Sequence, residues 1–382
     1  MTRIYLDHNA TTPMHPEVVQ DMLVCFETKY GNPSSVHTDG RDARKLLEAA
    51  RSQVAGLLST DPAEVIFTGS ATEANNTVIA HMHEISGKDM AFISSTIEHP
   101  SVDEPLASVA KSGREVIKVG VDRSGLVNLD TLETALRGRV ALLSLVWANN
   151  ETGVIQSVAE ISRLCSEYGV LLHLDATQAA GKIPINLRAL NVEFASVSAH
   201  KFNGPKGAGA LIVASPKSLT PWIQGGPQEA RRRGGTENIA GIVGMGRAAE
   251  VASRELDARV RKYGELRDQL WLGIKESIPS VERNGSCRSC LPNTLNVEFK
   301  RTPGDVILQA LDLEGISVSA GAACSSGSVA PSHVLSAMGL TSDEARSSLR
   351  FSVGQGNDTK DIVRTLTVLK SVVSRIRETN LS

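Results

Sequence analysis

The sequence lacks long hydrophobic runs, has almost no net charge and contains few cysteines, and each of these features excludes a class of protein. No apolar stretch reaches the roughly 18 uninterrupted residues of a membrane span. Forty basic residues against 42 acidic ones give a formal charge of −2, which implies no bulk attraction to nucleic acid or to an anionic membrane. Five cysteines in 382 residues are too few for a disulfide framework and are typical of a reducing compartment.

We expect no signal peptide at the start of the chain, because it turns acidic at Asp7 and lacks the apolar core of such a peptide. We therefore expect a cytoplasmic location. A length of 382 residues is too great for one compact core and predicts two domains.

Between about residues 60 and 215, short apolar runs alternate with segments of helical length. Runs rich in Val, Ile and Leu predict strands buried on both faces, and their alternation with helices predicts a mostly parallel sheet covered by helices. The predicted strands are residues 65–67, 91–93, 116–119, 140–146, 170–174, 194–198 and 210–213.

Beyond residue 239 the sequence changes character. Residues 239–274 are rich in Ala, Glu, Arg and Leu, which predicts a long connecting helix. After it we expect a half-exposed strand, a helix ended by Gly315, two more strands and a last helix; their ranges are 294–299, 305–313, 316–319, 349–353 and 359–377. The fold class is therefore α/β, with a large domain of residues 14–255 and a smaller α+β domain formed by residues 1–13 and 256–382.

Two strand ends carry the most informative side chains. Asp175 closes one apolar strand and Lys201 follows the next, and ligands of open α/β sheets bind at the carboxyl ends of the strands. A lysine that forms a Schiff base and a carboxylate that pairs with a pyridinium nitrogen are what pyridoxal phosphate requires. Asp175 could instead only cap a helix. Lys206 is a rival for Lys201, but it lies in a Pro/Gly turn where we expect exposure.

Further candidates follow other strands. Residues 68–73 join a strand to a helix, so backbone N–H groups there could bind a phosphate, although a plain N-cap is the commoner interpretation. Ser198 and His200 add phosphate donors beside the lysine. Gln178 could donate to a cofactor oxygen. His99 is either structural or stacked on a planar ring, where it could move protons.

Asn149 and Asn150 follow another strand and would bring amide donors to the same edge of the sheet. A plain turn is the stronger interpretation for Asn149 and the weaker one for Asn150.

The cysteines differ in their surroundings. Cys324 lies in a run of Ala, Gly and Ser, which predicts a thiol on a mobile loop, although such a cysteine is often buried and inert. Cys287 and Cys290 form a CxxC motif without the further ligands of a zinc site, so we expect no metal; a labile disulfide is the minor alternative. Cys25 and Cys165 fall in helical patterns and are expected in the core.

Taken together, these segments resemble the cysteine desulfurases of the class V aminotransferase family over essentially the whole chain. The matching segments are residues 6–13, 31–35, 71–73, 98–99, 148–153, 175–178, 200–201, 235–238 and the loop around Cys324. The resemblance implies fold type I of the pyridoxal-phosphate enzymes and a homodimer. The implied cofactor-binding residues are Ala71, Thr72, His99, Asn150, Asp175, Gln178, Ser198, His200, Lys201 and Thr236, the last reaching the neighbouring subunit's cofactor.

The resemblance also implies the reaction. Asn9 and Arg350 would hold the carboxylate of L-cysteine, Lys201 and His99 would transfer protons, and the Cys324 thiolate would take the sulfur as a persulfide and release alanine. The persulfide would pass to an acceptor protein, with iron–sulfur assembly, tRNA thiolation and DNA sulfur modification all open. The alternatives are a selenocysteine lyase or other pyridoxal-phosphate lyase of this fold, and a catalytically idle interaction partner.

Overall fold

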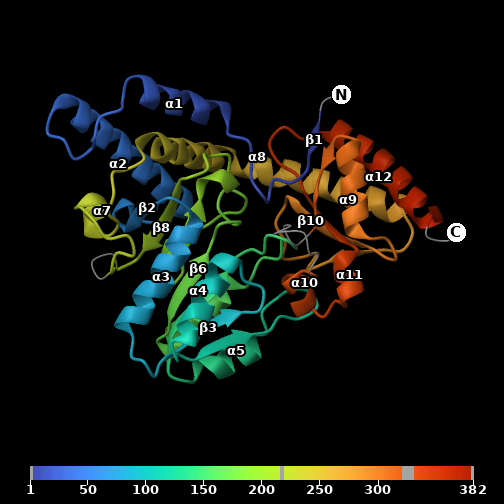
Figure 1. Ribbon diagram of the computed structural model, residues 1–382, viewed down its shortest axis with the longest axis horizontal. Coiled ribbons are helices and arrows are strands. Elements are labelled where there is room, and N and C mark those ends of the chain that lie inside the picture. The colour runs from blue at the N-terminus through green and yellow to red at the C-terminus, as the bar shows by residue number, and fades with distance from the viewer. Residues whose placement is uncertain (1–2, 216–218, 321–330, 380–382) are drawn as a thin grey trace.

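The structure is a computed structural model that describes residues 3–215, 219–320 and 331–379. A large α/β part and a smaller α+β part lie side by side and are joined by one long helix (Figure 1). The mostly parallel sheet expected from the sequence is confirmed. Its strands are β2 (Val65–Thr68), β3 (Ala91–Ser95), β4 (Val116–Val119), β5 (Val140–Val146), β6 (Leu171–Asp175), β7 (Phe194–Ser198) and β8 (Gly209–Val213).

The strand order in this sheet is β2-β8-β7-β6-β5-β3-β4, with β8 antiparallel to both of its neighbours. All other pairs are parallel, so β6 and β7 end side by side at the same edge. That edge receives the side chains on which the site depends.

Helices cover both faces of the sheet, which explains why its strands are nearly continuous apolar runs. One apolar cluster packs α3 and α4 on the sheet, and another packs α2, α6 and the first half of α8. The helices of this part are α1 (Pro16–Glu27), α2 (Thr38–Leu58), α3 (Ala71–Ile85), α4 (Pro100–Lys111), α5 (Leu129–Leu136), α6 (Val158–Tyr168), α7 (Gln228–Arg231) and α8 (Ile239–Ser277), with short 3-10 turns at Pro62–Glu64, Leu187–Ala189 and Ala199–Lys201.

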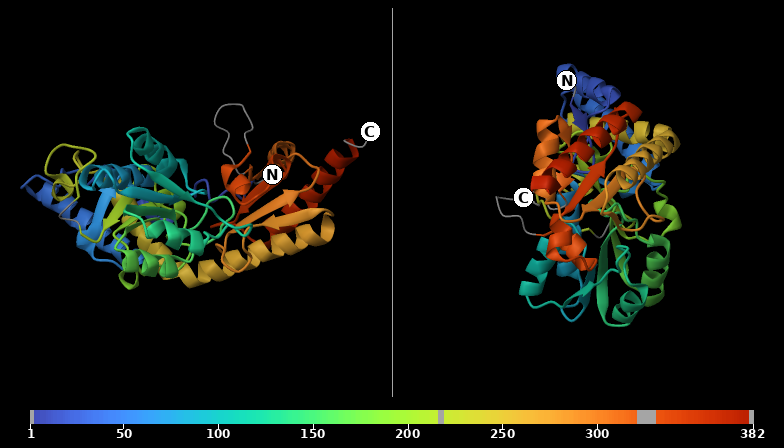
Figure 2. Two further views of the ribbon diagram at one scale, coloured as in Figure 1. Left: turned by 90° about the horizontal axis from the view of Figure 1, so that it is seen from below. Right: turned by 90° about the vertical axis from the view of Figure 1, so that its right-hand side faces the viewer.

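Helix α8 extends along both parts of the molecule (Figure 2). Its residues up to Ala252 pack in the core of the large part, and those from Tyr263 onward pack in a separate core. The change of core falls between these two residues, and a domain boundary at residue 255 stays a prediction.

The smaller part contains an antiparallel sheet of order β12-β13-β10-β9 and a two-stranded parallel pair, β1 with β11. Its elements are β1 (Ile4–Tyr5), β9 (Val281–Asn284), β10 (Thr294–Phe299), α9 (Gly304–Leu313), β11 (Ile316–Ser317), β12 (Ser319–Ala320), α10 (His333–Ala337), α11 (Ser342–Arg346), β13 (Ser348–Ser352) and α12 (Thr359–Thr379).

Two details of this part differ from the sequence-based expectation. All six residues of β10 are buried rather than alternating, because β10 is an inner strand, and its Thr294 and Asn296 side chains bond to other protein groups. The strand expected at 316–319 divides into two, since Ile316 pairs with Ile4 while Ser319 pairs with Arg350.

Candidate active site

Lys201 follows the end of β7 in the 3-10 turn Ala199–Lys201. Its Nζ donates hydrogen bonds to the carbonyl oxygens of Asn9, at 2.7 Å, and Ala10, at 2.9 Å. Burial, helped by the positive charge of Arg350, lowers the pKa of Lys201 to about 8. An amine that loses its proton this readily is suited to attack an aldehyde. Its rival Lys206 is exposed, as the turn sequence indicated.

Asp175 ends β6, the neighbour of β7, and is almost fully buried. Its Oδ1 accepts the backbone N–H of Thr177 at 3.0 Å, and its Oδ2 accepts the Nδ2 hydrogen of Asn75 at 2.9 Å. Both donors are neutral, so neither of them forms an ion pair with the carboxylate.

His99 is the N-cap of α4, and its Nδ1 accepts the backbone N–H of Ser101 at 3.1 Å. The same nitrogen lies 2.8 Å from Ser101 Oγ. The ring is exposed on the single chain, but its Nδ1 edge faces the buried Ser101. Desolvation lowers the pKa of His99, and Lys201 and His333 lower it further against the opposing charge of Asp175.

The N-terminus of α3 adjoins the end of β2 and suits an anion. Ser70 Oγ caps the helix by accepting the Glu73 N–H at 3.1 Å, so the plain N-cap interpretation holds for Ser70. The first N–H groups of any helix, here including Ala71 and Thr72, have no partner within the helix, and they attract negative charge.

Two residues near Lys201 could add to such an anion site. Ser198 is buried at the end of β7, where its side chain makes no capping bond. Burial and the charge of Lys201 lower the pKa of His200 to about 4, so its ring is neutral at physiological pH. His200 Nδ1 lies 3.1 Å from Thr11 Oγ1.

Two adjacent asparagines in the turn after β5 make different contacts. Asn149 Oδ1 accepts the backbone N–H groups of Glu151 and Thr152 at 2.9 and 3.0 Å, so Asn149 forms the turn, which was the stronger interpretation of its sequence. The Asn150 carbonyl accepts hydrogen bonds from Asn9 and Arg350, both at 3.0 Å. Asn150 therefore lies between the two residues expected to bind substrate.

Arg350 and Asn9 meet at this carbonyl, but they differ in spare hydrogen-bonding capacity. Arg350 bonds to Asp7 Oδ1 at 2.6 Å, while its buried Nε has no partner among the described residues. Asn9 Nδ2 donates to both Asn150 and Thr294. A substrate carboxylate could thus bind Arg350 directly, whereas it would have to displace a protein partner from Asn9. The role of Asn9 in substrate binding stays a prediction.

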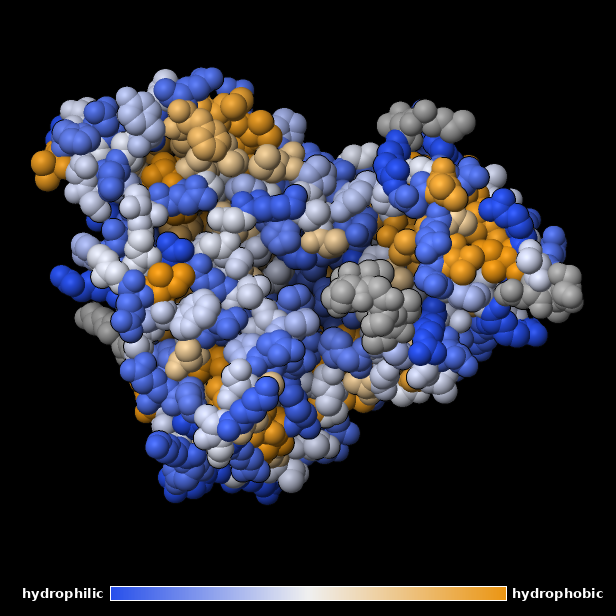
Figure 3. All heavy atoms as spheres, in the orientation of Figure 1, coloured by the Kyte–Doolittle hydropathy of each residue, from blue (hydrophilic) through white to orange (hydrophobic). Residues whose placement is uncertain are grey.

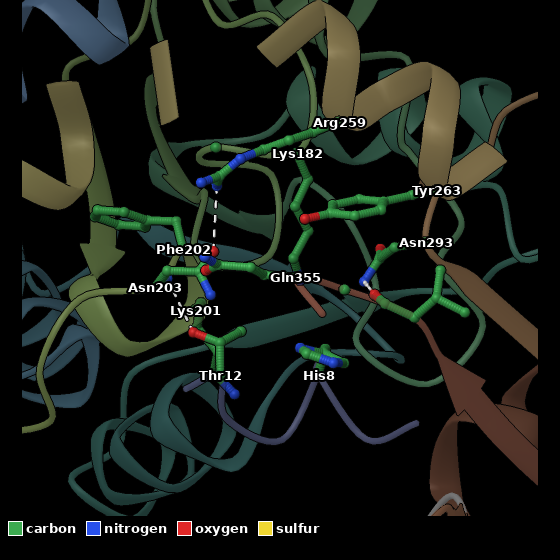
Figure 4. Close-up of a pocket in the computed structure, with 13 residues that line it drawn as sticks. His8, Thr12, Lys182, Lys201, Phe202, Asn203, Arg259, Tyr263, Asn293 and Gln355 are labelled. Carbon is green, nitrogen blue, oxygen red and sulfur yellow. Dashed lines mark hydrogen bonds between the residues drawn. The ribbon is translucent and has the colours of Figure 1, made fainter. Parts of the chain in front are cut away.

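Gln178 leads to a residue that the sequence did not single out. Its Nε2 donates to the Asn9 carbonyl at 2.9 Å, and its Oε1 accepts from the buried Lys182, which also bonds to Asn9 Oδ1 at 3.1 Å. Burial and the charge of Lys201 lower the pKa of Lys182 well below its ordinary value. Figure 4 shows Lys182 and Lys201 among the residues that line one small pocket, with Lys182 beside Arg259 and Tyr263 of α8.

Cys324 lies outside the described residues, but both ends of the segment that contains it are fixed beside the site. Before it, Ser319 of β12 pairs with Arg350. After it, Ser332 Oγ donates to Glu151 Oε2 at 2.5 Å, and Glu151 belongs to the turn after β5. Thr236 is exposed and lies in a loop of the large part.

The structure thus places most of the candidate residues at or just after the ends of five strands, β2, β3, β5, β6 and β7, and on β13. Asn75, Ser101 and Lys182 were missed. A signal existed for Asn75, because it is a polar residue on the buried face of α3, beside Ala74, Val78 and Ile79. Cys25 and Cys165 are buried as expected. In the part of the chain that the structure describes, no group of three or more His, Cys, Asp or Glu side chains could hold a metal ion.

A lysine, a carboxylate and a helix N-terminus at the carboxyl edge of a mostly parallel sheet define the class of pyridoxal-phosphate enzymes. The family model for class-V aminotransferases matches residues 4–365. A protein named cysteine desulfurase IscS, from Dictyoglomus turgidum, is 42% identical over 98% of this chain and 95% of its own. The chain therefore belongs to the class-V aminotransferase family.

Solved structures agree with this assignment and with fold type I. A NifS-like protein superposes with a TM-score of 0.92 at 35% identity, covering 98% of this chain and 100% of its own. SspA in complex with cysteine superposes with a TM-score of 0.81 at 32% identity, covering 92% of this chain and 99% of its own. The resemblance seen in the sequence is confirmed.

Pyridoxal phosphate is the cofactor of this family, and the described residues fit it chemically. The amine of Lys201 is easily deprotonated, the Asp175 carboxylate has only neutral partners, and the start of α3 offers N–H donors for a phosphate. Nothing in this donor set conflicts with a flat, anionic aldehyde.

The rate of cofactor capture should follow the ionisation of Lys201. Only the uncharged amine attacks an aldehyde, so capture of pyridoxal phosphate by the apo-protein is expected to accelerate with pH and level off above about pH 8. Arg350→Gln removes a charge that lowers this pKa, so its profile should move to higher pH, whereas Arg350→Lys should match the wild type. Stopped-flow absorbance measures the rate; a wild-type profile that levels off only near the ordinary lysine pKa of about 10.4 would contradict the assignment.

Proposed function

We propose that this protein is a pyridoxal-phosphate-dependent cysteine desulfurase that removes sulfur from L-cysteine, releases L-alanine and carries the sulfur as a persulfide on Cys324. The observation that carries the proposal is the convergence of Lys201, Asp175 and His99 at one sheet edge, with both ends of the Cys324 segment anchored beside Arg350 and Glu151. The names of the relatives and the cysteine in the SspA complex support the same substrate.

Each residue has a distinct task in this proposal. Ala71, Thr72, Ser198 and His200 would hold the cofactor phosphate, Asp175 would pair with the ring nitrogen, and Asn150 and Gln178 would lie beside the ring, as the resemblance implied. Thr236 would approach the cofactor of the neighbouring subunit.

Pyridoxal phosphate, when bound, supplies an aldehyde for covalent attachment to an amine and a ring that withdraws electrons. The chain's own residues do the rest. Lys201 Nζ releases and accepts a proton near neutral pH because its pKa is lowered to about 8. Arg350 fixes the substrate carboxylate through donors that Asp7 and Asn150 leave open, and Asn9 assists.

The sulfur leaves by nucleophilic displacement. The Cys324 thiolate attacks the sulfur of the bound cysteine, the substrate's carbon–sulfur bond breaks, and the sulfur stays on Cys324 as a persulfide. The three-carbon skeleton takes up protons and departs as alanine. An acceptor protein then receives the persulfide sulfur. We propose a cytoplasmic location for this reaction, in keeping with the free thiols of Cys25, Cys165, Cys287 and Cys290.

A comparison of L-cysteine with L-selenocysteine tests the proposed reaction against a lyase of the same fold. A desulfurase should release alanine from cysteine and require Cys324 to do so. Preferential release from selenocysteine that does not depend on Cys324 would favour the lyase.

Asp175→Ala is expected to bind the cofactor yet turn over cysteine at least about 100-fold more slowly, because the ring nitrogen loses the charge that stabilises its protonated form. Asp175→Glu keeps the charge and should retain more activity than the alanine variant. Cofactor content is measured by absorbance and alanine by chromatography. Near-normal turnover by Asp175→Ala would remove Asp175 from this role.

We also propose a homodimer that associates through α1. Val19, Leu23 and Phe26 of this helix are 38%, 44% and 65% exposed, and apolar side chains gather where α1 lies in Figure 3. Contiguous apolar surface of this kind marks an interface. Leu23→Glu should yield monomers in light scattering, whereas Leu272→Glu, at a more exposed position on α8, should stay dimeric. A dimeric Leu23→Glu protein would contradict this interface.

A further inference from the structure

A continuous chain of hydrogen bonds links Asp175 to His99 through two residues that none of the proposed roles uses. Asn75, fully buried on α3, donates from Nδ2 to Asp175 Oδ2 and to Ser101 Oγ, both at 2.9 Å. Ser101 Oγ in turn lies 2.8 Å from His99 Nδ1. The three bonds join α3, the start of α4 and the end of β6.

The chemistry of Asp175 fixes the orientation of the Asn75 amide. An ionised carboxylate only accepts hydrogen bonds, so the NH₂ group, not the amide oxygen, must face it. The two hydrogens of that group are then committed to Asp175 and Ser101. The Asn75 Oδ1 has no hydrogen-bond partner within the described ranges, so no opposing bond favours the flipped amide.

This orientation determines the direction in which the Ser101 hydroxyl hydrogen points. Because Ser101 Oγ already accepts a bond from Asn75, its hydrogen is free to point at His99 Nδ1. The Ser101 backbone N–H points at the same nitrogen, at 3.1 Å. Two donors aimed at one ring nitrogen require that this nitrogen carries a lone pair and no hydrogen.

We propose that Asn75 and Ser101 are positioning residues that couple the Asp175 carboxylate to His99 and hold the imidazole neutral, with its hydrogen on Nε2. The inference rests on the proposed function in that Asp175 and His99 are the cofactor's expected neighbours. One buried amide thus orients the carboxylate on one side and selects the tautomer of the histidine on the other. His99 then presents an N–H, rather than a second acceptor, at its Nε2.

The charges around His99 act on the same equilibrium. Asp175 and Asp103 favour the protonated ring, whereas desolvation, Lys201 and His333 disfavour it, and the pKa of His99 lies below its ordinary value. The two donors at Nδ1 also disfavour the protonated ring, because protonation of Nδ1 would place its new hydrogen against both donor hydrogens. Loss of one donor should therefore make His99 easier to protonate.

Nitrogen NMR of the cofactor-free protein, with ¹⁵N-labelled histidine, tests this network directly. In the wild type, His99 Nδ1 should show the shift of a nitrogen without hydrogen, its resonance being assigned by loss in His99→Gln. Ser101→Ala removes one hydrogen bond to the neutral ring, and Asn75→Ala removes the donor that keeps the Ser101 hydroxyl hydrogen directed at Nδ1. Each variant should therefore raise the titration midpoint of His99, by roughly half to one pH unit.

Two matched variants separate this role from general damage to the fold. Ser101→Thr keeps the hydroxyl and should titrate like the wild type. Asn76→Ala removes a neighbouring amide whose bonds go to the carbonyls of Thr72 and Ser101, and it should also leave His99 unchanged. A hydrogen on His99 Nδ1 in the wild type, or wild-type titration in both Asn75→Ala and Ser101→Ala, would overturn the proposal.

The measurement uses neither cofactor nor substrate, so its outcome is independent of the desulfurase reaction. If the expected titrations are observed but no alanine is released from cysteine, the network is supported and the proposed function is refuted. If alanine is released but His99 carries its hydrogen on Nδ1, the proposed function is supported and the network is refuted.

Discussion

Lys201→Ala is expected to abolish both covalent attachment of pyridoxal phosphate and turnover of L-cysteine, lowering kcat by roughly four orders of magnitude or more. Lys201 is the lysine at the end of β7, and its pKa is lowered to about 8 by burial and by Arg350. The side chain is held by two backbone carbonyls rather than by an ion pair, so its loss should leave the fold intact. Absorbance of the bound cofactor and alanine release are the two readouts.

Two other lysines serve as checks on this assignment. Lys206→Ala, at an exposed turn position, should keep wild-type turnover. Lys182 is the more serious rival, because it is buried in the same pocket and its pKa is also strongly lowered. Borohydride reduction followed by peptide mapping should find the cofactor on Lys201 alone, and its recovery on Lys182 or Lys206 would refute the assignment.

Cys324→Ser is expected to divide the reaction into two halves. The proton transfers assigned to Lys201 and His99 do not need the thiol, so the variant should load cofactor, bind cysteine and change its absorbance. It should then stop without releasing alanine, since a hydroxyl has a much higher pKa than a thiol and supplies almost no anion at neutral pH. Rapid-scan absorbance combined with alanine assays follows the two halves separately.

The same substitution elsewhere controls for the change of sulfur to oxygen. Cys287→Ser, at an exposed position, should turn over cysteine at the wild-type rate. Wild-type alanine production by Cys324→Ser would mean that another group accepts the sulfur. Persulfide found on Cys287 or Cys290 before it reaches Cys324 would lead to the same conclusion.

The sequence predicted the architecture well because the strands can be recognised from their composition. Buried parallel strands are short apolar runs, and polar residues at their ends, such as Asp175 and Lys201, fall at one edge by topology alone. The rest of the site depends on contacts between distant segments. Asn75 meets Asp175 across 100 positions, and Arg350 meets Asp7 across 343. No local pattern encodes such pairings.

Burial was harder to predict than strand position. The polar residues of β10 suggested one exposed face, but the structure buries them by bonding Asn296 to the Glu151 carbonyl and Thr294 to Asn9. These bonds satisfy the two side chains, so the burial of Thr294 and Asn296 carries no large penalty. Asn9 shows the reverse case, since the resemblance assigned it to substrate while the structure already uses both of its amide hydrogens.

The central claim is that this chain moves the sulfur of L-cysteine onto Cys324, and a single-turnover experiment tests it most directly. Cofactor-loaded protein is mixed with a limiting amount of L-cysteine in the absence of reductant, and alanine and the mass of the peptide containing Cys324 are measured in the same sample. The account predicts one additional sulfur atom on that peptide for each alanine released. Alanine accompanied by free sulfide and an unmodified Cys324 peptide would contradict it.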